Sequence, residues 1–475
     1  MTGGISSMTV GSIELRSYQL DLIAEIQGRL ARPGASVMCQ LPTGAGKTVV
    51  ACHLLADAVS ADKCGAWLTH RRELGRQSGG MLSRVGLDVS WLAEMPAAER
   101  RWSHGAVTMV SPALRTVPEP ESPGLLVVDE AHHVPAATWR KVVEDWRAAG
   151  GQVVGMTATP WRMSRTQSFL PWFDELVCGP SIQALQDQGW LSRPVVVVPG
   201  DARADTRHAR IASTGDYQAA WAESEIMSLL AHAPVLEVWE SWTSGMPDRR
   251  TMWFAPTVHC ANALAARLAV TAGAAVLTGE TPARERDAII ADIAEERLTH
   301  LVSVDVLSEG LDLPDVPTVA SLRPTRSLAV WLQQCGRGAR PKPSGEYLVL
   351  DYAGNCQRHG LPDAERWWSL TARGKPVGSG EMPSASCWRS DCRDVRLHPS
   401  EQACWHCGTD QYMECSACRV HKRWTNYRNG TICIGCKEAL NRYRQEQKVT
   451  SVPTVADLAR KNKQYIYRKR QALSA

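Results

Sequence analysis

The sequence predicts an α/β protein with two tandem domains, each built around a parallel β-sheet. The chain has 475 residues, too many for one ordinary hydrophobic core. Short apolar runs alternate with helix-like patterns, and they do so in two separate series. Several of the runs are continuous stretches of Val and Leu, which is typical of strands buried on both faces of a parallel sheet.

Each series supplies five candidate strands. The first series, within residues 13–180, reads SVMCQLP, CGAWLTH, AVTMVSP, LLVVDEA and QVVGMTATP. The second, within residues 249–355, reads TMWFAP, AAVLTGE, HLVSVDVL, TVASLRP and EYLVLDY. Residues 181–248 between them are predicted to be a mainly helical connector. Residues 1–12 are predicted to be a flexible N-terminus, and the Gly-, Pro- and Ser-rich residues within 356–386 predict a linker.

The composition is that of a globular protein, with 44% apolar and 21% charged residues. The net charge of +4 is too small to identify a binding partner. No apolar run reaches the roughly 18 residues that a membrane-spanning helix needs, and the N-terminal residues lack the pattern of a secretory signal. We therefore expect a cytoplasmic protein with no membrane contact, in which thiols stay reduced.

The segment LPTGAGKT (41–48) follows the first candidate strand and precedes a helical run. Glycines in such a loop let backbone N–H groups approach phosphate oxygens, and the start of the helix favours an anion. Lys47 would reach the β- and γ-phosphates of a nucleotide, and the Thr48 hydroxyl would hold Mg²⁺. The alternative is a chance glycine turn. The loop residues expected to contact nucleotide are Thr43, Gly44, Gly46, Lys47 and Thr48.

A pair of carboxylates ends another strand, in LLVVDEAHH (125–133). Ligands of parallel α/β sheets bind at the carboxyl ends of the strands. Asp129 would therefore hold Mg²⁺, and Glu130 would orient and deprotonate an attacking water. The alternative is a surface acidic pair that caps the next helix.

Two arginines, one helical turn apart, follow Gln333 in QQCGRGAR (333–340). Arginine forks grip carboxylate or phosphate oxygens. Arg337 and Arg340 therefore predict an anion site, although a helix that pairs with neighbouring acids would use the same residues.

These motifs, in this order, resemble superfamily 2 helicases of the DEAD/DEAH type, including those of DNA repair and type III restriction. The resemblance covers most of residues 13–353. Besides the three motifs above, it includes six further sequence blocks. These blocks are LRSYQ (15–19), LTHRREL (68–74), VSPAL (110–114), GMTATP (155–160), WFAPTVHCANAL (253–264) and VDVLSEGLDLPDV (304–316).

The resemblance implies two RecA-like domains that close on ATP and Mg²⁺ and move a nucleic-acid strand. Gln19 is then the expected adenine contact, and Gln333, Arg337 and Arg340 act on the γ-phosphate from the second domain. Gly310 and Asp312 belong to the expected coupling motif of that domain. Val304 departs from the Thr that many relatives carry there. The segment GPSIQALQDQGWLSRPVV resembles that of DNA-repair and restriction-type helicases, which favours DNA over RNA.

Eight cysteines cluster within residues 387–436, mostly in pairs two residues apart. Such pairs place both sulfurs on one metal, and two pairs complete a four-sulfur Zn²⁺ site. The four cysteines of each zinc site are either sequential or interleaved along the chain, and His398, His406 and His421 are possible substitute ligands. The alternative to metal binding is that the cysteines form disulfides. The cysteines are Cys387, Cys392, Cys404, Cys407, Cys415, Cys418, Cys433 and Cys436.

The second half of this module resembles zinc ribbons found beside nucleases, but no histidine follows His421 to build a His-based metal nuclease core. The tail, residues 437–475, is basic and interleaved with tyrosines, a combination suited to single-stranded nucleic acid. A solvated tail without a specific role is the alternative. We expect the module and tail to bind nucleic acid or a replication, repair or nuclease partner.

The main functional prediction is an ATP-dependent helicase or translocase, with DNA as the favoured substrate. Two alternatives share the same ATP site. One is the motor subunit of a restriction or nuclease complex, and the other is an ATP-gated nucleic-acid clamp that never unwinds.

The purified chain is expected to contain two zinc ions, because eight thiolates fill two closed four-sulfur sites. Metal analysis of the purified protein measures this directly. One ion per chain would mean that only one group of four cysteines binds metal, and none would remove the module.

Overall fold

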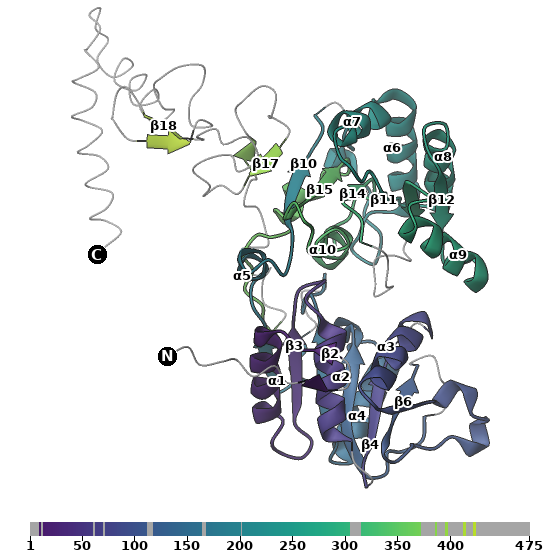
Figure 1. Ribbon diagram of the computed structural model, residues 1–475, viewed down its shortest axis with the longest axis vertical. Helices are drawn as coiled ribbons and strands as arrows, with labels where there is room; N and C mark the ends of the chain where they lie inside the picture. The colour runs from purple at the N-terminus through teal and green to yellow at the C-terminus, as the bar shows by residue number, and fades with distance from the viewer. Residues whose placement is uncertain are drawn as a thin grey trace, which may run out of the picture. The chain divides into compact units, whose positions relative to one another are not determined.

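The computed structural model describes residues 9–10, 13–59, 62–69, 72–111, 117–163, 168–200, 202–304 and 315–371, together with the backbone of four short strands between residues 385 and 423. The chain divides into two compact units, Met1–Met382 and Pro383–Ala475. In the described residues, the first unit contains two parallel sheets with helices between the strands (Figure 1).

The first sheet has the strand order β5-β6-β4-β7-β8-β3-β9, and every neighbouring pair is parallel. All five strands predicted in the first series are present, so this part of the prediction is confirmed. The strands are β3 (Ser36–Gln40), β4 (Cys64–Leu68), β5 (Asp88–Trp91), β6 (Ala106–Val110), β7 (Pro123–Asp129), β8 (Gln152–Thr157) and β9 (Glu175–Cys178).

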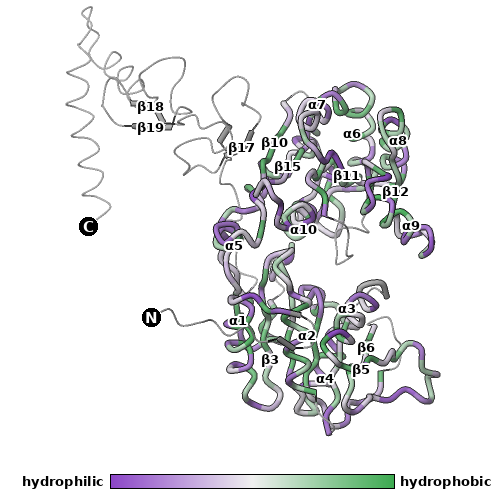
Figure 2. Tube along the Cα trace, viewed as in Figure 1, coloured by the Kyte–Doolittle hydropathy of each residue, from purple (hydrophilic) through white to green (hydrophobic). Residues whose placement is uncertain are grey.

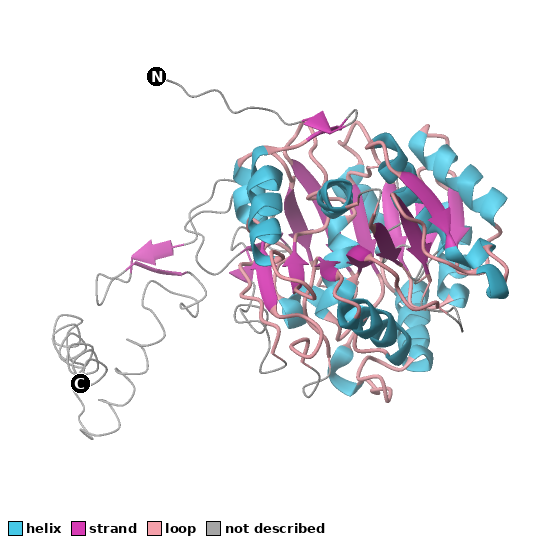
Figure 3. Cartoon of the chain, turned by 90° about the horizontal axis from the view of Figure 1, so that it is seen from below, coloured by secondary structure: helices cyan, strands magenta, loops and turns pink. Residues whose placement is uncertain are grey.

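Helices cover both faces of this sheet because successive strand residues point to opposite sides. Val37 and Cys39 of β3 join the apolar cluster of α1 (Ser17–Arg29) and α2 (Lys47–Ala58). Met38, between them, joins the cluster of α4 (Ala137–Ala148) on the opposite face. Figure 3 shows helices on both sides of the strands, and Figure 2 shows the apolar character of the central strands.

Six further elements complete the first half of the unit. A two-stranded antiparallel ribbon precedes α1, and a helix and 3-10 turns connect the strands. These elements are β1 (Thr9–Val10), β2 (Ile13–Glu14), α3 (Arg72–Arg84), and the 3-10 turns η1 (Leu92–Glu94), η2 (Ala97–Glu99) and η3 (Ala131–His133).

Within the first unit, the second sheet has the order β12-β13-β11-β14-β15-β10, again with parallel pairs. The five strands predicted in the second series are all present. The strands are β10 (Arg193–Val197), β11 (Thr251–Phe254), β12 (Ala274–Leu277), β13 (His300–Ser303), β14 (Thr318–Ser321) and β15 (Glu346–Asp351). The helices of this half are α5 (Ile182–Asp187), α6 (Ala219–His232), α7 (Val235–Thr243), α8 (Val258–Leu268), α9 (Ala283–Ala294), α10 (Leu328–Gly336) and α11 (Asn355–His359), with one 3-10 turn, η4 (Thr206–His208).

The segment expected to be a mainly helical connector, residues 181–248, also supplies a strand of the second sheet. Its RPVVV run forms β10 and pairs with β15 along its whole length. The run has three consecutive valines, a strand-like pattern, with Pro194 at its second position, where a strand tolerates proline. Its place in the second sheet depends on pairing with a distant strand, β15.

The segment expected to be a linker, residues 356–386, begins as packed structure. Residues 355–359 form α11, and Leu370 is only 6% exposed. The carbonyl of Leu370 accepts a hydrogen bond from the backbone N–H of Phe169, at 2.8 Å. The chain therefore returns from the second sheet to the core of the first before it leaves the unit.

The second unit contributes two antiparallel strand pairs to the described backbone. They are β16 (Ala385–Ser386) with β17 (Val395–Leu397), and β18 (Tyr412–Glu414) with β19 (His421–Arg423). The eight candidate zinc cysteines lie outside the described residues, so the zinc module stays a prediction. Among the described helices, none combines the length and apolar character needed to cross a bilayer.

Candidate nucleotide site

The phosphate loop joins β3 to α2, and its two glycines are required by its shape. Gly44 and Gly46 have φ angles of +83° and +85°, in the region that strains any residue with a Cβ. A Cβ placed on Gly46 would also lie 2.4 Å from Nε2 of Gln19. The loop therefore keeps a bare backbone at the N-terminus of α2, as a phosphate-binding loop needs.

Helix α1 anchors this loop through two side chains on one carbonyl. Tyr18 Oη donates to Ala45 O at 2.8 Å, and Gln19 Nε2 donates to the same oxygen at 3.3 Å. Gln19 Oε1 accepts from the backbone N–H of Arg16 at 2.9 Å. The structure thus places Gln19, the expected adenine contact, directly behind the phosphate loop. Its contact with the base stays a prediction.

The acidic pair lies where β7 ends, as expected for ligands of a parallel sheet. Glu130 has φ 49° and ψ 54°, a left-handed conformation that is uncommon for a residue with a side chain. Its backbone N–H donates to Asp129 Oδ1 at 3.1 Å, which stabilises the turn. Strain of this kind costs on the order of 1–3 kcal/mol and is concentrated at functional sites.

His132 links the acidic pair to the end of β8, which the sequence analysis did not predict. Its Nδ1 lies 3.3 Å from Glu130 Oε2 and 3.1 Å from the hydroxyl of Thr157. The same hydroxyl accepts from the backbone N–H of Thr159 at 3.1 Å. His132 is 7% exposed, so this contact is buried. The only sequence signal for it is its position two residues after Glu130.

The arginine motif comes from α10, in the other half of the unit. Ser327 caps its start by accepting from the N–H of Val330 at 3.4 Å. The helix ends at Gly336, so Arg337 is its C-cap and Arg340 lies beyond it. The expected helical turn between the two arginines is therefore wrong. A Cβ on Gly338 would lie 2.4 Å from the Tyr347 ring, which shows how closely the backbone approaches that ring past the helix end.

The end of α10 meets the phosphate loop directly. A Cβ placed on Gly336 would lie 2.6 Å from the Cβ of Thr43. A Cβ on Gly44 would lie 4.0 Å from Cγ of Arg340. Both glycines let the backbone of one segment approach a side chain of the other, so the arginine motif of one sheet lies against the phosphate loop of the other.

Charged residues of both sheets affect the pKa of Lys47 at this junction. Burial lowers the pKa of Lys47, Glu130 and Asp129 raise it, and Arg337 lowers it further. Lys47 Nζ donates to Leu41 O at 3.3 Å, so the ammonium lies over its own loop. These groups, a lysine and two carboxylates of one sheet and an arginine of the other, are of the kinds that bind a polyanion and a metal ion.

The other predicted residues divide into those that the structure places and those outside the described residues. Thr48 is the second residue of α2. Gln333 is 4% exposed, and its Nε2 makes no hydrogen bond within the described part of the chain. Gly310 and Asp312 lie outside the described residues, as does most of the 304–316 motif.

Two helicase families match the two halves. "Type III restriction enzyme, res subunit" matches residues 12–162, and "Helicase conserved C-terminal domain" matches residues 235–342. Together the matches span more than half of the chain and contain the phosphate loop, the acidic pair and the arginine motif. The chain belongs to the superfamily 2 helicases.

Relatives of this helicase include a "51.5 kDa protein" of a Lactococcus phage, 28% identical over 79% of this chain and 78% of the relative. The Saccharomyces cerevisiae protein named "Putative ATP-dependent helicase IRC3" is 24% identical over 72% of this chain and 51% of its own length. The structure of "DUF1998 helicase MrfA bound to DNA" shares the fold, with a TM-score of 0.50, 18% identity, and coverage of 72% of this chain and 49% of that chain. The helicase thus spans about half the length of the yeast relative.

Gly336→Ala is expected to lower ATP turnover by one to two orders of magnitude, because the new methyl group separates α10 from Thr43 and a misplacement of about 1 Å costs roughly 10²-fold. Steady-state ATPase kinetics and thermal melting measure the effect. Gly245→Ala is the matched control, since nothing lies within 4 Å of a Cβ there. Equal turnover in the two variants would mean that the Gly336 contact is unimportant for hydrolysis.

Proposed function

We propose that this superfamily 2 helicase hydrolyses ATP between its two sheets and uses the cycle to move along nucleic acid, with DNA as the substrate. The observation that carries the proposal is the contact of Gly336, which precedes Arg337 at the end of α10, with Thr43 of the phosphate loop. A phosphate loop and a carboxylate pair alone would bind nucleotide. An arginine from a second domain adds stabilisation of charge on the transferred phosphoryl group, which is worth roughly 10³–10⁵ in rate in related enzymes.

The residues present fit ATP and Mg²⁺. The bare loop at Gly44 and Gly46 can accept phosphates, and the buried Nε2 of Gln333 can donate to them. Asp129 and Thr48 would hold Mg²⁺, an ion bound through carboxylate, hydroxyl and phosphate oxygens. When bound, the metal ion neutralises negative charge on the β- and γ-phosphates.

The proposed roles follow from position. Lys47 binds the β- and γ-phosphates from the loop. Glu130, whose Oε2 is buried beside His132 and makes no hydrogen bond within the described residues, orients the attacking water and accepts its proton. Arg337 and Arg340 bind the γ-phosphate from the other side. His132 and Thr157 connect Glu130 to the end of β8. A change at Glu130 during hydrolysis can therefore be transmitted to the rest of the first sheet.

Coupling to movement has an electrostatic basis. Lys47 and Arg337 are both cations, and their repulsion at a buried site raises the free energy of the closed arrangement. A bound nucleotide triphosphate supplies the negative charge that offsets this repulsion, and the loss of the γ-phosphate weakens it. The two sheets are therefore expected to close with ATP and to loosen after hydrolysis, which moves a strand bound across both.

DNA is favoured by the match to a type III restriction family and by the likeness of residues 179–196 to restriction and repair helicases. The basic tail supports nucleic-acid contact in general. We also propose that the cysteine module binds two Zn²⁺ ions and holds nucleic acid or a replication, repair or nuclease partner. A cytoplasmic location stays a prediction from the sequence.

A motor subunit of a restriction or nuclease complex is the second candidate, and the same family match favours it. The motor chemistry is identical in the two cases. Purification of the chain from its source with a separate nuclease chain would support this candidate.

Glu130→Gln is expected to keep ATP affinity and to lose turnover by at least 10²-fold, because the amide cannot accept a proton from water. Fluorescent-nucleotide binding and steady-state ATPase assays separate the two effects. Glu121→Gln, an exposed site just before the same strand, is the matched control. Near-normal turnover in Glu130→Gln would remove Glu130 from its proposed role.

ATPase activity is expected to rise with DNA more than with RNA of the same length. Parallel assays with single-stranded DNA, duplex DNA, forked DNA and RNA measure the preference, and strand displacement on the fork tests unwinding. Stimulation by RNA alone would contradict the DNA assignment. ATPase activity without displacement on any substrate would favour the clamp.

A further inference from the structure

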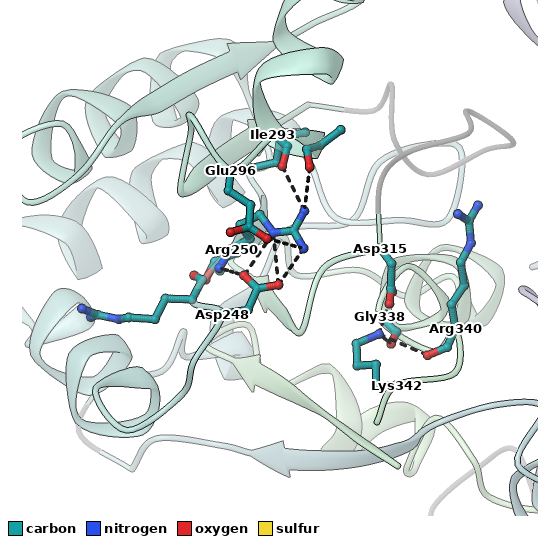
Figure 4. Close-up of polar contacts among 11 residues, drawn as sticks. Asp248, Arg250, Ile293, Glu296, Asp315, Gly338, Arg340 and Lys342 are labelled. Atoms are coloured by element: carbon teal, nitrogen blue, oxygen red, sulfur yellow. Dashed lines mark hydrogen bonds and ion pairs between the residues drawn. The ribbon is translucent and has the colours of Figure 1, made fainter. Parts of the chain in front are cut away.

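A buried ammonium group lies immediately after the arginine motif. The side chain of Lys342 is 8% exposed, and its Nζ makes three hydrogen bonds (Figure 4). The acceptors are Asp315 Oδ1 at 2.6 Å, Gly338 O at 2.6 Å and Arg340 O at 3.1 Å. A lysine ammonium has three donors, so every donor of Lys342 is used.

Two of these bonds hold the backbone that carries the arginines. Gly338 and Arg340 lie in the segment that follows the end of α10, where the N–H groups of Gly338 and Ala339 make only i→i−3 turn bonds, at 3.1 and 3.3 Å. A cation at this end is also favoured by the helix dipole. Figure 4 shows the Arg340 carbonyl turned toward Lys342, while its side chain extends away. The same carbonyl accepts from Ser192 Oγ at 2.9 Å.

Asp315 is the counter-ion that keeps Lys342 charged in this buried place. Burial lowers the pKa of Lys342, whereas the hydrogen bond and charge of Asp315 raise it. Burial raises the pKa of Asp315, and Lys342, Arg340 and Arg250 lower it. Asp248 also raises the pKa of Lys342, and Arg340 lowers it. Each member of the ion pair therefore stabilises the charged form of the other.

We propose that Lys342 is a positioning residue for hydrolysis, which fixes the backbone of Gly338 and Arg340 so that Arg337 and Arg340 reach the phosphates. Asp315 holds the ammonium in place for this task. The inference rests on the proposed role of the arginines. It identifies a function for two residues that lie outside the arginine motif.

The first test replaces Lys342 by methionine, which keeps the length of the side chain and removes its donors. We expect kcat to fall roughly 10²-fold, because a misplacement of about 1 Å of reacting groups costs this much. The KM for ATP and the affinity for a fluorescent nucleotide should stay near those of the unmodified chain, since the phosphate loop is unchanged. Lys141→Met is the control, because Lys141 forms an ion pair of similar length, 2.8 Å, but on the exposed surface of α4.

The second test replaces Asp315 by asparagine, alone and together with Lys342→Met. Asp315 is 34% exposed in its side chain, so this variant is expected to fold and decides the question even if Lys342→Met does not. Asp315→Asn should lower kcat, and the double variant should be no slower than Lys342→Met alone. Unchanged kcat in Asp315→Asn, or effects that multiply in the double variant, would overturn the proposal.

Glu130→Gln, measured in parallel, separates the two possible failures. Loss of turnover in Glu130→Gln with normal turnover in Lys342→Met would refute only the positioning role. Normal turnover in both would refute the proposed function on which it rests. A Lys342→Met variant that lowers the melting temperature but keeps kcat would show a structural role and overturn the proposal.

Discussion

The contact between Gly336 at the end of α10 and Thr43 of the phosphate loop is the interaction on which the rest of the structure depends. At this junction burial lowers the pKa of Lys47, Glu130 and Asp129 raise it, and Arg337 of the other sheet lowers it further. No single domain can build this arrangement. Each sheet supplies only part of the charge that a nucleotide triphosphate needs. Both sheets in one chain are therefore required for a complete site.

The fold brings these groups together through strand ends and glycines. Parallel strands deliver loops to one edge of each sheet, and glycines at the junction allow the loops to touch. Gly336 packs against Thr43, and Gly46 lies under Gln19. Glu130 leaves its strand in a strained left-handed conformation, held by Asp129 and placed beside His132. The strained backbone of Glu130 and the close packing at the glycines both position groups of the candidate nucleotide site.

Sequence patterns were sufficient for the ten predicted strands and for the phosphate loop, because buried parallel strands and glycine-rich turns leave local signals. The strand β10 also has a valine run, but it lies within the segment expected to be a helical connector, and its place in the second sheet depends on pairing with β15. His132 and Lys342 could not be assigned from spacing. Their partners, Thr157 and Asp315, lie about 25 residues away along the chain, and only the folded sheets bring the members of each pair together. The end of α10 at Gly336 was also missed, because the arginine spacing alone suits a helix.

The most direct measurement of the central claim is the ATP turnover of Arg337→Ala against its ATP affinity. Arg207→Ala is the control, because Arg207 is an exposed arginine that pairs only with Asp205 among the described contacts. Arg337→Ala is expected to bind nucleotide nearly normally and to lose roughly 10³-fold or more in turnover stimulated by nucleic acid. Normal stimulated turnover in a folded Arg337→Ala variant would contradict the central claim, because the second sheet would then supply no charge to the reaction.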